Sequence, residues 1–235
     1  MTSYNMNIAI IPARSKSKRI KNKNIKLFFG KPIIFYSIDL ALKSKIFDKV
    51  LVSTDSKKIK KIAEKYGAEV PFIRPKNLSN DFVGTPAVVK HAIHWCQKKK
   101  LNIKNICCIY PTAPLLEKKY LIEGYKKIKN SNYDFVFSAC KHEKTVQRSF
   151  YLDKKNNTKM FFSSFYSKRS QDLKDAYFDA GSFYWGTKKS WLQKKPMIFS
   201  KNSSIIKLPN NKVQDLDTNL DWKKLSIKFK KTKDI

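Results

Sequence analysis

The sequence predicts an α/β fold in which helices cover a central, mostly parallel β-sheet. Short, unbroken apolar runs such as IAII, VLV and ICCI have no polar face, which is typical of strands buried on both sides. Between them lie segments whose apolar side chains recur at helical spacing. Strands that alternate with helices in this way indicate βαβ units and therefore a parallel sheet.

This alternation runs through the first 140 residues. Strands are expected at 6–13, 49–55, 68–75, 105–110 and 134–140. Helices are expected at 32–44, 57–67, 85–99 and 117–130. Ligands of parallel sheets bind beyond the carboxyl ends of the strands. The loops that follow residues 13, 55 and 110 should therefore meet at one edge of the sheet and form a site.

The composition of the chain changes after residue 140. The stretch 147–173 is rich in aromatic residues and is expected to leave the sheet, with its turn at 154–158. Strands at 176–186 and 204–209, a loop at 213–218, a helix at 219–229 and a frayed tail at 230–235 are expected to follow. No linker or internal repeat divides the chain. We therefore expect one domain over residues 1–235, with an excursion at about 140–180.

The chain is strongly basic. Fifty Lys and Arg against 18 Asp and Glu give a formal charge of +32, which by itself favours a nucleic-acid-binding protein. The Lys residues are spread along the whole chain together with abundant Asn, Ile and Phe, so a general compositional bias explains most of the charge. A dedicated nucleic-acid surface is the less favoured interpretation.

Cysteine usage and hydropathy indicate the compartment. The four cysteines form neither a CxxC pair nor a disulfide framework, which is typical of reduced thiols. No apolar stretch approaches the roughly 18 residues that span a bilayer, and no secretory leader is recognisable. We therefore expect a soluble protein of the cytoplasm that has no membrane partner.

The loop after the first expected strand is crowded with basic residues between Arg14 and Lys23. A loop that passes from a strand into a helix offers backbone N–H groups and the helix dipole to an anion. Arg and Lys add charge-assisted hydrogen bonds to phosphate oxygens. Neither G-x-x-x-x-G-K-[ST] nor G-x-G-x-x-G is present. The residues alone therefore predict an anion site without identifying its ligand.

Motifs along most of the chain resemble those of one enzyme family. AIIPARSKSKRIKNKNI resembles the opening of the sugar cytidylyltransferases, which make CMP-activated nonulosonic acids. LVSTD, GAEVPFIRP with LSND, PTAP and VQDLDTNLDW follow in the order of that family, so the resemblance spans residues 8–222. VQRSF, KRSQDL and YFDAGSFYWG resemble the branch of the family that acts on pseudaminic acid.

The resemblance implies a Rossmann-like nucleotidyltransferase, usually a homodimer, whose excursion packs across the subunits. Its substrates would be CTP and a nine-carbon keto-sugar acid, which in this branch is pseudaminic acid. The anomeric hydroxyl of the sugar would attack the α-phosphorus and release pyrophosphate, with Mg²⁺ neutralising the phosphates. This chemistry depends on positioning and charge rather than on a covalent nucleophile.

The resemblance also assigns the nucleotide site. Arg14 and Lys18 match catalytic positions that contact the triphosphate, and Lys23 matches a phosphate-binding lysine. Asn24 matches a residue that helps to hold the nucleotide, and Arg74 matches an arginine near it.

Asp215 and Asp217 match the paired catalytic aspartates that hold Mg²⁺ in the family. The spacing also makes sense independently, because residues i and i+2 of an extended segment point to the same side. The pair would then present two hard oxygen ligands to one ion. The alternative is an N-cap before the helix at 219–229, which Asp217 or Thr218 could provide.

The sugar site is assigned more loosely. Arg169 and Gln171 match positions around the sugar, and a guanidinium suits the carboxylate of a keto-sugar acid. Tyr110 stands where relatives that act on sialic acid carry Gln, which favours the pseudaminic acid branch. Asp179 and Phe183 lie in the stretch that is expected to line the sugar pocket.

Some features leave alternatives open. Ser15 and Lys16 replace two glycines of the family pattern, whose backbone freedom would let the loop pass close to phosphates. An inactive nucleotide-binding relative is therefore one alternative, and an enzyme for sialic or legionaminic acid is another. Asp55 could contact the nucleotide or cap the following helix. His91 and His94 lack further ligands at a recognised spacing, so we expect no metal there.

Overall fold

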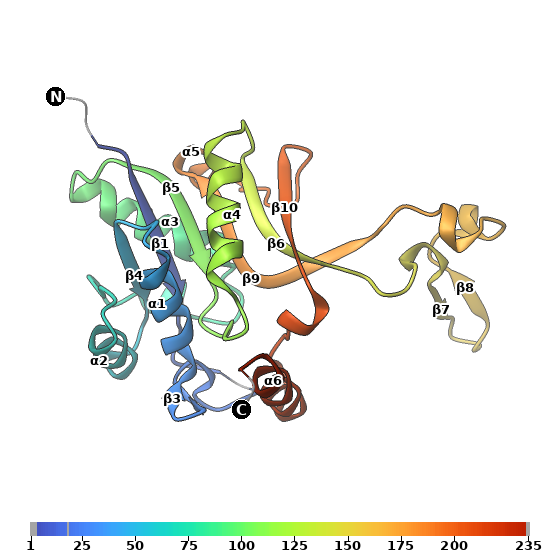
Figure 1. Ribbon diagram of the computed structural model, residues 1–235, viewed down its shortest axis with the longest axis horizontal. Helices are drawn as coiled ribbons and strands as arrows, with labels where there is room; N and C mark the ends of the chain where they lie inside the picture. Colours follow the sequence, from blue (N-terminus) through green and yellow to red (C-terminus); the bar gives the residue numbers. More distant parts are fainter. Residues whose placement is uncertain (1–3, 18, 234–235) are drawn as a thin grey trace.

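The computed structural model describes residues 4–17 and 19–233 and has a six-stranded sheet at its centre (Figure 1). From one edge to the other, the strands are β4 (Lys49–Ser53), β1 (Met6–Pro12), β5 (Ile103–Ile109), β9 (Tyr177–Thr187), β6 (Phe135–Lys141) and β10 (Ser203–Leu208). β9 is antiparallel to both neighbours, whereas the other pairs are parallel. The predicted α/β fold with a mostly parallel sheet is confirmed.

Helices cover both faces of the sheet. α1 (Ile33–Ser44), α2 (Lys57–Lys65) and α4 (Lys118–Lys129) pack on one face, and α3 (Thr85–Lys98) and α5 (Lys188–Leu192) pack on the other. The apolar runs at the centres of β1, β4, β5 and β6 are buried, as their continuity predicts. The four cysteines are buried and unpaired. Among the described residues, no helix is long and apolar enough to cross a membrane.

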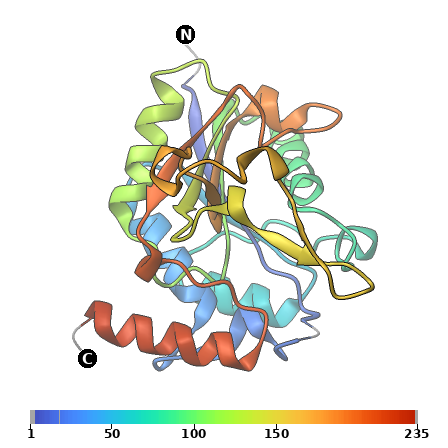
Figure 2. The ribbon, with the colours of Figure 1, turned by 90° about the vertical axis from the view of Figure 1, so that its right-hand side faces the viewer.

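The last helix packs beside the loop that follows β1. α6 (Asn219–Lys233) lies against the ribbon of β2 (Leu27–Phe28) and β3 (Lys31–Pro32), as Figures 1 and 2 both show. The ring of Phe28 meets those of Phe229 and Trp222 edge to face, with centroids 5.0 and 5.5 Å apart. Leu216 is buried in the same cluster. This packing brings the segment before α6 next to the basic loop.

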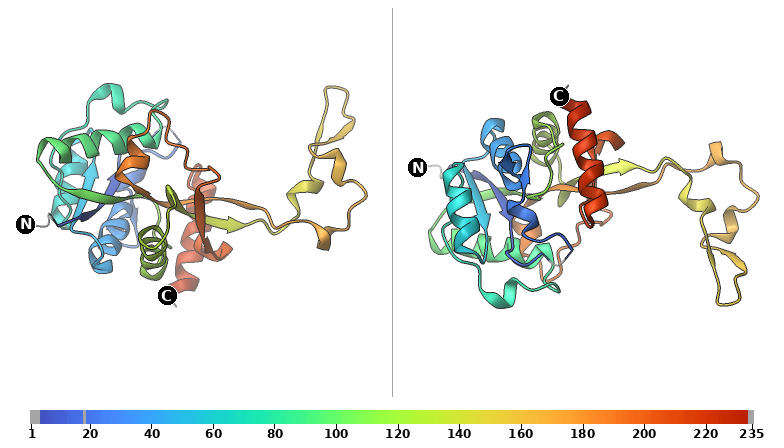
Figure 3. Two further views of the ribbon diagram at one scale, coloured as in Figure 1. Left: turned by 90° about the horizontal axis from the view of Figure 1, so that it is seen from above. Right: turned by 90° about the horizontal axis from the view of Figure 1, so that it is seen from below.

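Residues 142–176 leave the sheet as an arm between β6 and β9 (Figures 1 and 3). The arm holds the hairpin of β7 (Phe150–Leu152) and β8 (Thr158–Met160), together with the short 3-10 turns η3 (Val146–Arg148), η4 (Ser163–Phe165) and η5 (Ser170–Asp172). Three further 3-10 turns lie elsewhere, at η1 (Lys23–Ile25), η2 (Lys76–Leu78) and η6 (Asn210–Lys212). The arm occupies the stretch for which an excursion is predicted.

Two expected elements differ from the structure. Residues 68–75 make only isolated parallel bridges, Leu51 with Glu69 and Thr54 with Ile73, rather than a continuous strand. Pro71 has no N–H to donate to a ladder, which explains the interruption. The expectation of a frayed tail at 230–235 is also wrong for residues 230–233, because α6 continues to Lys233 and Phe229 anchors it in the core, while residues 234 and 235 lie outside the described residues.

Candidate functional site

Beyond the carboxyl ends of β1 and β5 lies a cavity of about 290 Å³, which we call the first cavity. Its walls come from the basic loop, from segment 74–88 and from residues 110–112 after β5. Five of the residues predicted from the sequence line it, namely Arg14, Lys23, Asn24, Arg74 and Tyr110. Lys18, the remaining predicted member of the loop, lies outside the described residues. Segments far apart in sequence thus meet at the edge where a ligand was expected.

Arg14 pairs with a carboxylate in this cavity. Its Nη1 lies 2.5 Å from Oδ1 of Asp81, and both side chains are about one third exposed. Asn24 is buried, and its amide donates to the carbonyl oxygen of Arg14 at 2.9 Å. The side chain of Asn24 therefore fixes the backbone from which Arg14 projects. An anion in the cavity would compete with Asp81 for Nη1 of Arg14 or bind the other N–H groups of the guanidinium.

Ser15 explains how the loop does without the glycines of the family pattern. The backbone N–H and the hydroxyl of Ser15 donate to the two oxygens of Asp55, at 2.7 and 2.6 Å. In the described part of the loop only Asn22 has a positive φ, so the backbone at Ser15 and Lys16 requires no glycine. The helix after Asp55 is capped instead by Ser56, which accepts from the N–H of Ile59. Asp55 therefore anchors the loop rather than capping α2.

Arg74 is almost completely buried at the wall of the first cavity, with 3% of its surface exposed. Its Nε donates to the hydroxyl of Ser79 at 3.1 Å, and its backbone N–H donates to Thr54. Burial lowers the pKa of the guanidinium, while Asp55 opposes that shift. A buried cation with few partners is suited to bind an anionic or carbonyl-bearing ligand.

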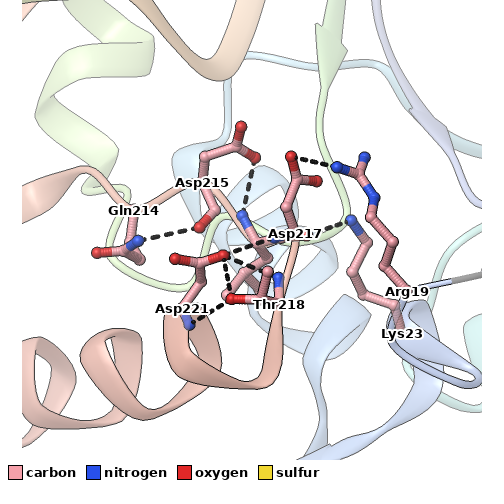
Figure 4. A network of polar contacts seen from close by, with 8 residues as sticks. Arg19, Lys23, Gln214, Asp215, Asp217, Thr218 and Asp221 are labelled. Carbon is pink, nitrogen blue, oxygen red and sulfur yellow. Dashed lines mark hydrogen bonds and ion pairs between the residues drawn. The ribbon is translucent and has the colours of Figure 1, made fainter.

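Asp215 and Asp217 lie on either side of Leu216 in the segment before α6. The ammonium of Lys23 donates to the carbonyl oxygen of Leu216 at 2.6 Å, and Nη1 of Arg19 lies 2.6 Å from Oδ2 of Asp217. Figure 4 shows the two carboxylates on the same side of the segment, next to these cations. Burial lowers the pKa of Lys23, while Asp217 and Asp215 oppose that shift. The basic loop and the aspartates thus form one charged surface.

The N-terminus of α6 is capped without Asp217. The hydroxyl of Thr218 accepts from the N–H of Asp221 at 3.2 Å, and Oδ2 of Asp221 accepts from the N–H of Thr218 at 2.8 Å. This reciprocal arrangement is a capping box. The carboxylate of Asp217, which pairs with Arg19, is therefore not needed to cap α6.

The donor set fits a magnesium ion better than a metal that needs a complete protein cage. Two carboxylates on one side supply hard oxygen ligands, and Mg²⁺ usually adds waters and substrate phosphates to one or two such groups. In the described part of the chain, no group of three His, Cys, Asp or Glu could hold a metal. The ring of His91 packs against that of Phe72, with centroids 4.6 Å apart.

A second cavity, of about 630 Å³, adjoins the first. Tyr110 and Thr112 line both cavities and form the wall between them. The second cavity is also lined by Asp179, Tyr184 and Asp215. The basic side chains at its walls are Lys141, His142 and Lys228. The structure therefore offers two adjoining compartments, with one of the paired aspartates at the second.

Comparison with known proteins agrees with this geometry. A family-wide sequence model described as cytidylyltransferase matches residues 8–218. The chain belongs to the cytidylyltransferase family.

Several relatives define its place in that family. It is 47% identical to a pseudaminic acid cytidylyltransferase of Campylobacter jejuni over 95% of this chain and 96% of that protein. It is 32% identical to an N-acylneuraminate cytidylyltransferase of Escherichia coli, over 96% of this chain and 53% of the relative. The fold also matches a CMP:2-keto-3-deoxy-manno-octonic acid synthetase solved with CTP, with a TM-score of 0.73, 13% identity and coverage of 97% and 100% of the two chains. At that identity the structural match shows the fold alone.

The sugar-site residues predicted for this cytidylyltransferase are divided between three places. Tyr110 and Asp179 line the second cavity. Arg169 and Gln171 lie on the arm, where Arg169 pairs with Asp172 at 2.8 Å, and neither lines the first or the second cavity. Phe183 has no exposed surface and packs in the core against α4, so its side chain reaches neither cavity.

Some residues of this cytidylyltransferase site escape sequence reasoning. Arg19 lies in the same basic loop as Arg14. Nothing in the sequence near Arg19 predicts its ion pair with Asp217, which lies 198 residues further along the chain. Asp81 stands in the LSND motif and could have been suspected. Tyr184 and Lys228 line the second cavity from β9 and α6, and no local pattern places them there.

Proposed function

We propose that this protein transfers CMP from CTP to the anomeric hydroxyl of pseudaminic acid and releases pyrophosphate. The observation that carries the proposal is the pair of adjoining cavities, one lined by cationic residues and one reached by Asp215, in a chain closely similar to pseudaminic acid cytidylyltransferases. Reactions of this type need two substrates side by side, with their charges compensated.

The position of each residue in the two cavities suggests its role in the reaction. Arg14 and Lys23 would bind the triphosphate of CTP in the first cavity, together with Lys18 of the same loop, and Arg74 and Asn24 would hold the nucleotide. The sugar would bind in the second cavity beside Tyr110 and Asp179. A bond forms between the anomeric oxygen and the α-phosphorus, the bond to pyrophosphate breaks, and the hydroxyl proton is released to water. The shared wall of Tyr110 and Thr112 would align the two substrates.

Asp215 and Asp217 would hold Mg²⁺, and Asp217 would leave Arg19 to do so. When bound, the ion would supply positive charge to the phosphate oxygens. The geometry favours this role because Thr218 and Asp221 already cap α6.

The arm is proposed to pair two copies of the chain into a homodimer. It exposes a set of large apolar side chains, namely Phe150, Tyr151, Leu152, Phe161, Phe162 and Tyr166. Exposed apolar groups of this density favour association. A second copy is the fitting occupant because Arg169 and Gln171, for which the resemblance implies sugar contacts, lie on the same arm and line neither the first nor the second cavity of their own chain. Buried, unpaired thiols suit the cytoplasm as its location.

The dimer proposal has a direct test. A Phe150→Ser and Phe161→Ser double variant should be monomeric by analytical ultracentrifugation and should lose most turnover, because Arg169 and Gln171 no longer reach a partner. Lys154→Ser and Lys155→Ser at the turn of the same hairpin form a matched control and should remain dimeric. A monomeric wild type, or a monomeric variant with full turnover, would contradict the proposed dimer.

The substrate test is pyrophosphate release with Mg²⁺ and each nucleoside triphosphate, with pseudaminic, N-acetylneuraminic and legionaminic acids in parallel. Release with CTP and pseudaminic acid supports the proposal. Release with another of these acids would keep the reaction and change the sugar. Tight, salt-sensitive binding of RNA or DNA without any release would favour the nucleic-acid alternative that the charge suggests.

A further inference from the structure

β9 contains an irregularity at the point where it passes the two cavities. Phe137 of β6 pairs with Tyr184, and an unbroken register would pair Ala139 with Ser182. Ala139 pairs instead with Asp179, so β9 carries three extra residues. Gly181 within them has a φ of +58°, a conformation that side chains disfavour. Such bulges are frequent next to active sites, where they redirect a side chain.

The bulge is held by hydrogen bonds from both neighbouring strands. The hydroxyl of Ser138, on β6, accepts from the N–H groups of Ser182 and Phe183 at 3.2 and 3.1 Å. On the other side, the N–H of Tyr110 donates to the carbonyl oxygen of Ser182 at 2.9 Å. The bulge therefore also fixes the residue that separates the two cavities.

The three extra residues change which side of the sheet Asp179 occupies. Residues five apart in a regular strand point to opposite faces. An odd insertion reverses that relation, so Asp179 and Tyr184 lie on the same face, and the phenol of Tyr184 donates to Oδ2 of Asp179 at 2.6 Å. Oδ1 of Asp179 accepts from the N–H of Gly181 at 2.9 Å. A carboxylate has about four acceptor sites, so two remain for a ligand.

Tyr184 also extends the contact toward the nucleotide side. Its ring centroid lies 5.4 Å from that of Tyr110, with the two rings tilted by 52°. The hydroxyl of Tyr110 is in turn 2.9 Å from that of Thr85, which lines the first cavity. The rings of Tyr110 and Tyr184 thus lie next to each other between Thr85 at the first cavity and the carboxylate of Asp179 in the second. Burial and the neighbouring phenol and carboxylate raise the pKa of Tyr184, which keeps it a donor.

We propose that Tyr184 is a positioning residue, which holds the carboxylate of Asp179 so that it accepts hydrogen bonds from hydroxyl or amide N–H groups of the sugar substrate. This inference rests on the proposed function, because it takes the second cavity as the sugar site. It adds a residue on β9 that acts through Asp179 and packs against Tyr110 at the wall between the two cavities.

A double-mutant cycle tests this role. Tyr184→Phe should raise the KM of the sugar acid roughly tenfold, the effect expected when a hydrogen bond to a charged group is lost, while the KM of CTP changes less than twofold. Asp179→Ala should raise the sugar KM at least as much. Because Tyr184 acts through Asp179, the double variant should be no worse than Asp179→Ala alone. Tyr177→Phe is the matched control, because it removes a tyrosine hydroxyl from β9 at a position that lines neither cavity. It should leave the KM values of both substrates unchanged.

Calorimetric binding of the sugar acids to the same variants, with CTP absent, gives a readout that does not require turnover. Wild type that binds pseudaminic acid, with weaker binding in Tyr184→Phe, supports the inference. Equal binding in both proteins, or strictly additive effects of the two substitutions, would overturn the inference and leave the proposed function intact. Wild type that binds none of the sugar acids would overturn the proposed function and the inference together.

Discussion

Lys23 is the titratable residue of the basic loop that lies next to the paired aspartates. Its ordinary pKa of 10.5 is lowered by burial, so it loses its proton at a less alkaline pH than a free lysine. The neutral amine cannot balance a triphosphate. We expect kcat/KM for CTP to fall as the pH rises through this lowered pKa. A pH profile of kcat/KM measures this pKa, because kcat/KM reports the ionisation of groups in the free enzyme.

The matched variant for this prediction is Lys23→Arg. A guanidinium keeps its proton throughout this pH range. The alkaline limb of the profile should therefore move to higher pH, even if the overall rate is lower. A limb that stays in place in Lys23→Arg would assign the titration to another group.

The paired aspartates give the second prediction at this scale. Asp215→Asn and Asp217→Asn should each lower kcat by roughly 100-fold or more, because the Mg²⁺ that is proposed to neutralise the phosphates would no longer be bound. The Mg²⁺ concentration needed for half-maximal rate should rise in both. The measurement is pyrophosphate release over a Mg²⁺ titration.

Asp221→Asn is the control in the same segment. The structure commits Asp221 to capping α6, so its replacement should cost about 1 kcal/mol of stability and leave the Mg²⁺ dependence unchanged. If all three variants behave alike, the effect comes from disturbing the segment, and the magnesium proposal fails.

At the scale of elements, Gly124 shows how α4 is fitted to the sheet. A Cβ at this position would lie 2.7 Å from Cδ1 of Trp185 on β9. Alanine would favour the helix by about 1 kcal/mol, but overpacking of a core costs about 1–3 kcal/mol. Gly124→Ala should therefore lower the free energy of unfolding by about 1 kcal/mol in urea denaturation. Glu123→Ala, on the exposed side of α4, should not lower the free energy of unfolding. A Gly124→Ala variant more stable than wild type would show that α4 can shift.

The buried strands could be predicted because their apolar runs are continuous, and the edge where the site lies follows from a parallel sheet. The resemblance located Arg14, Asp215 and Asp217 by their motifs. What the sequence could not give depends on register and distant packing. Regular alternation in YFDAGSFYWG would put Asp179 and Phe183 on one face, but the bulge sends Asp179 to a cavity and leaves Phe183 in the core.

At the scale of the whole molecule, the charge of +32 acts on every anion that approaches. The field is screened over about 8 Å at physiological ionic strength. Raising the salt from about 0.05 to about 0.5 M should therefore raise the KM of CTP several-fold. The KM of the sugar acid, with a single carboxylate, should rise less. Steady-state kinetics over a salt series tests this, and equal slopes for both substrates would exclude a dominant role of charge in binding CTP.

The ion pair between Arg14 and Asp81 also bears on how quickly the site empties. Pyrophosphate is a highly charged product, and a loop of cations strong enough to capture CTP would hold it firmly. Asp81 stays tethered within reach of Arg14 and can take its place beside that cation as the product departs. If the basic loop binds the triphosphate as proposed, the carboxylate would compete with the leaving anion for Arg14, which would weaken product binding and speed the return to the free enzyme.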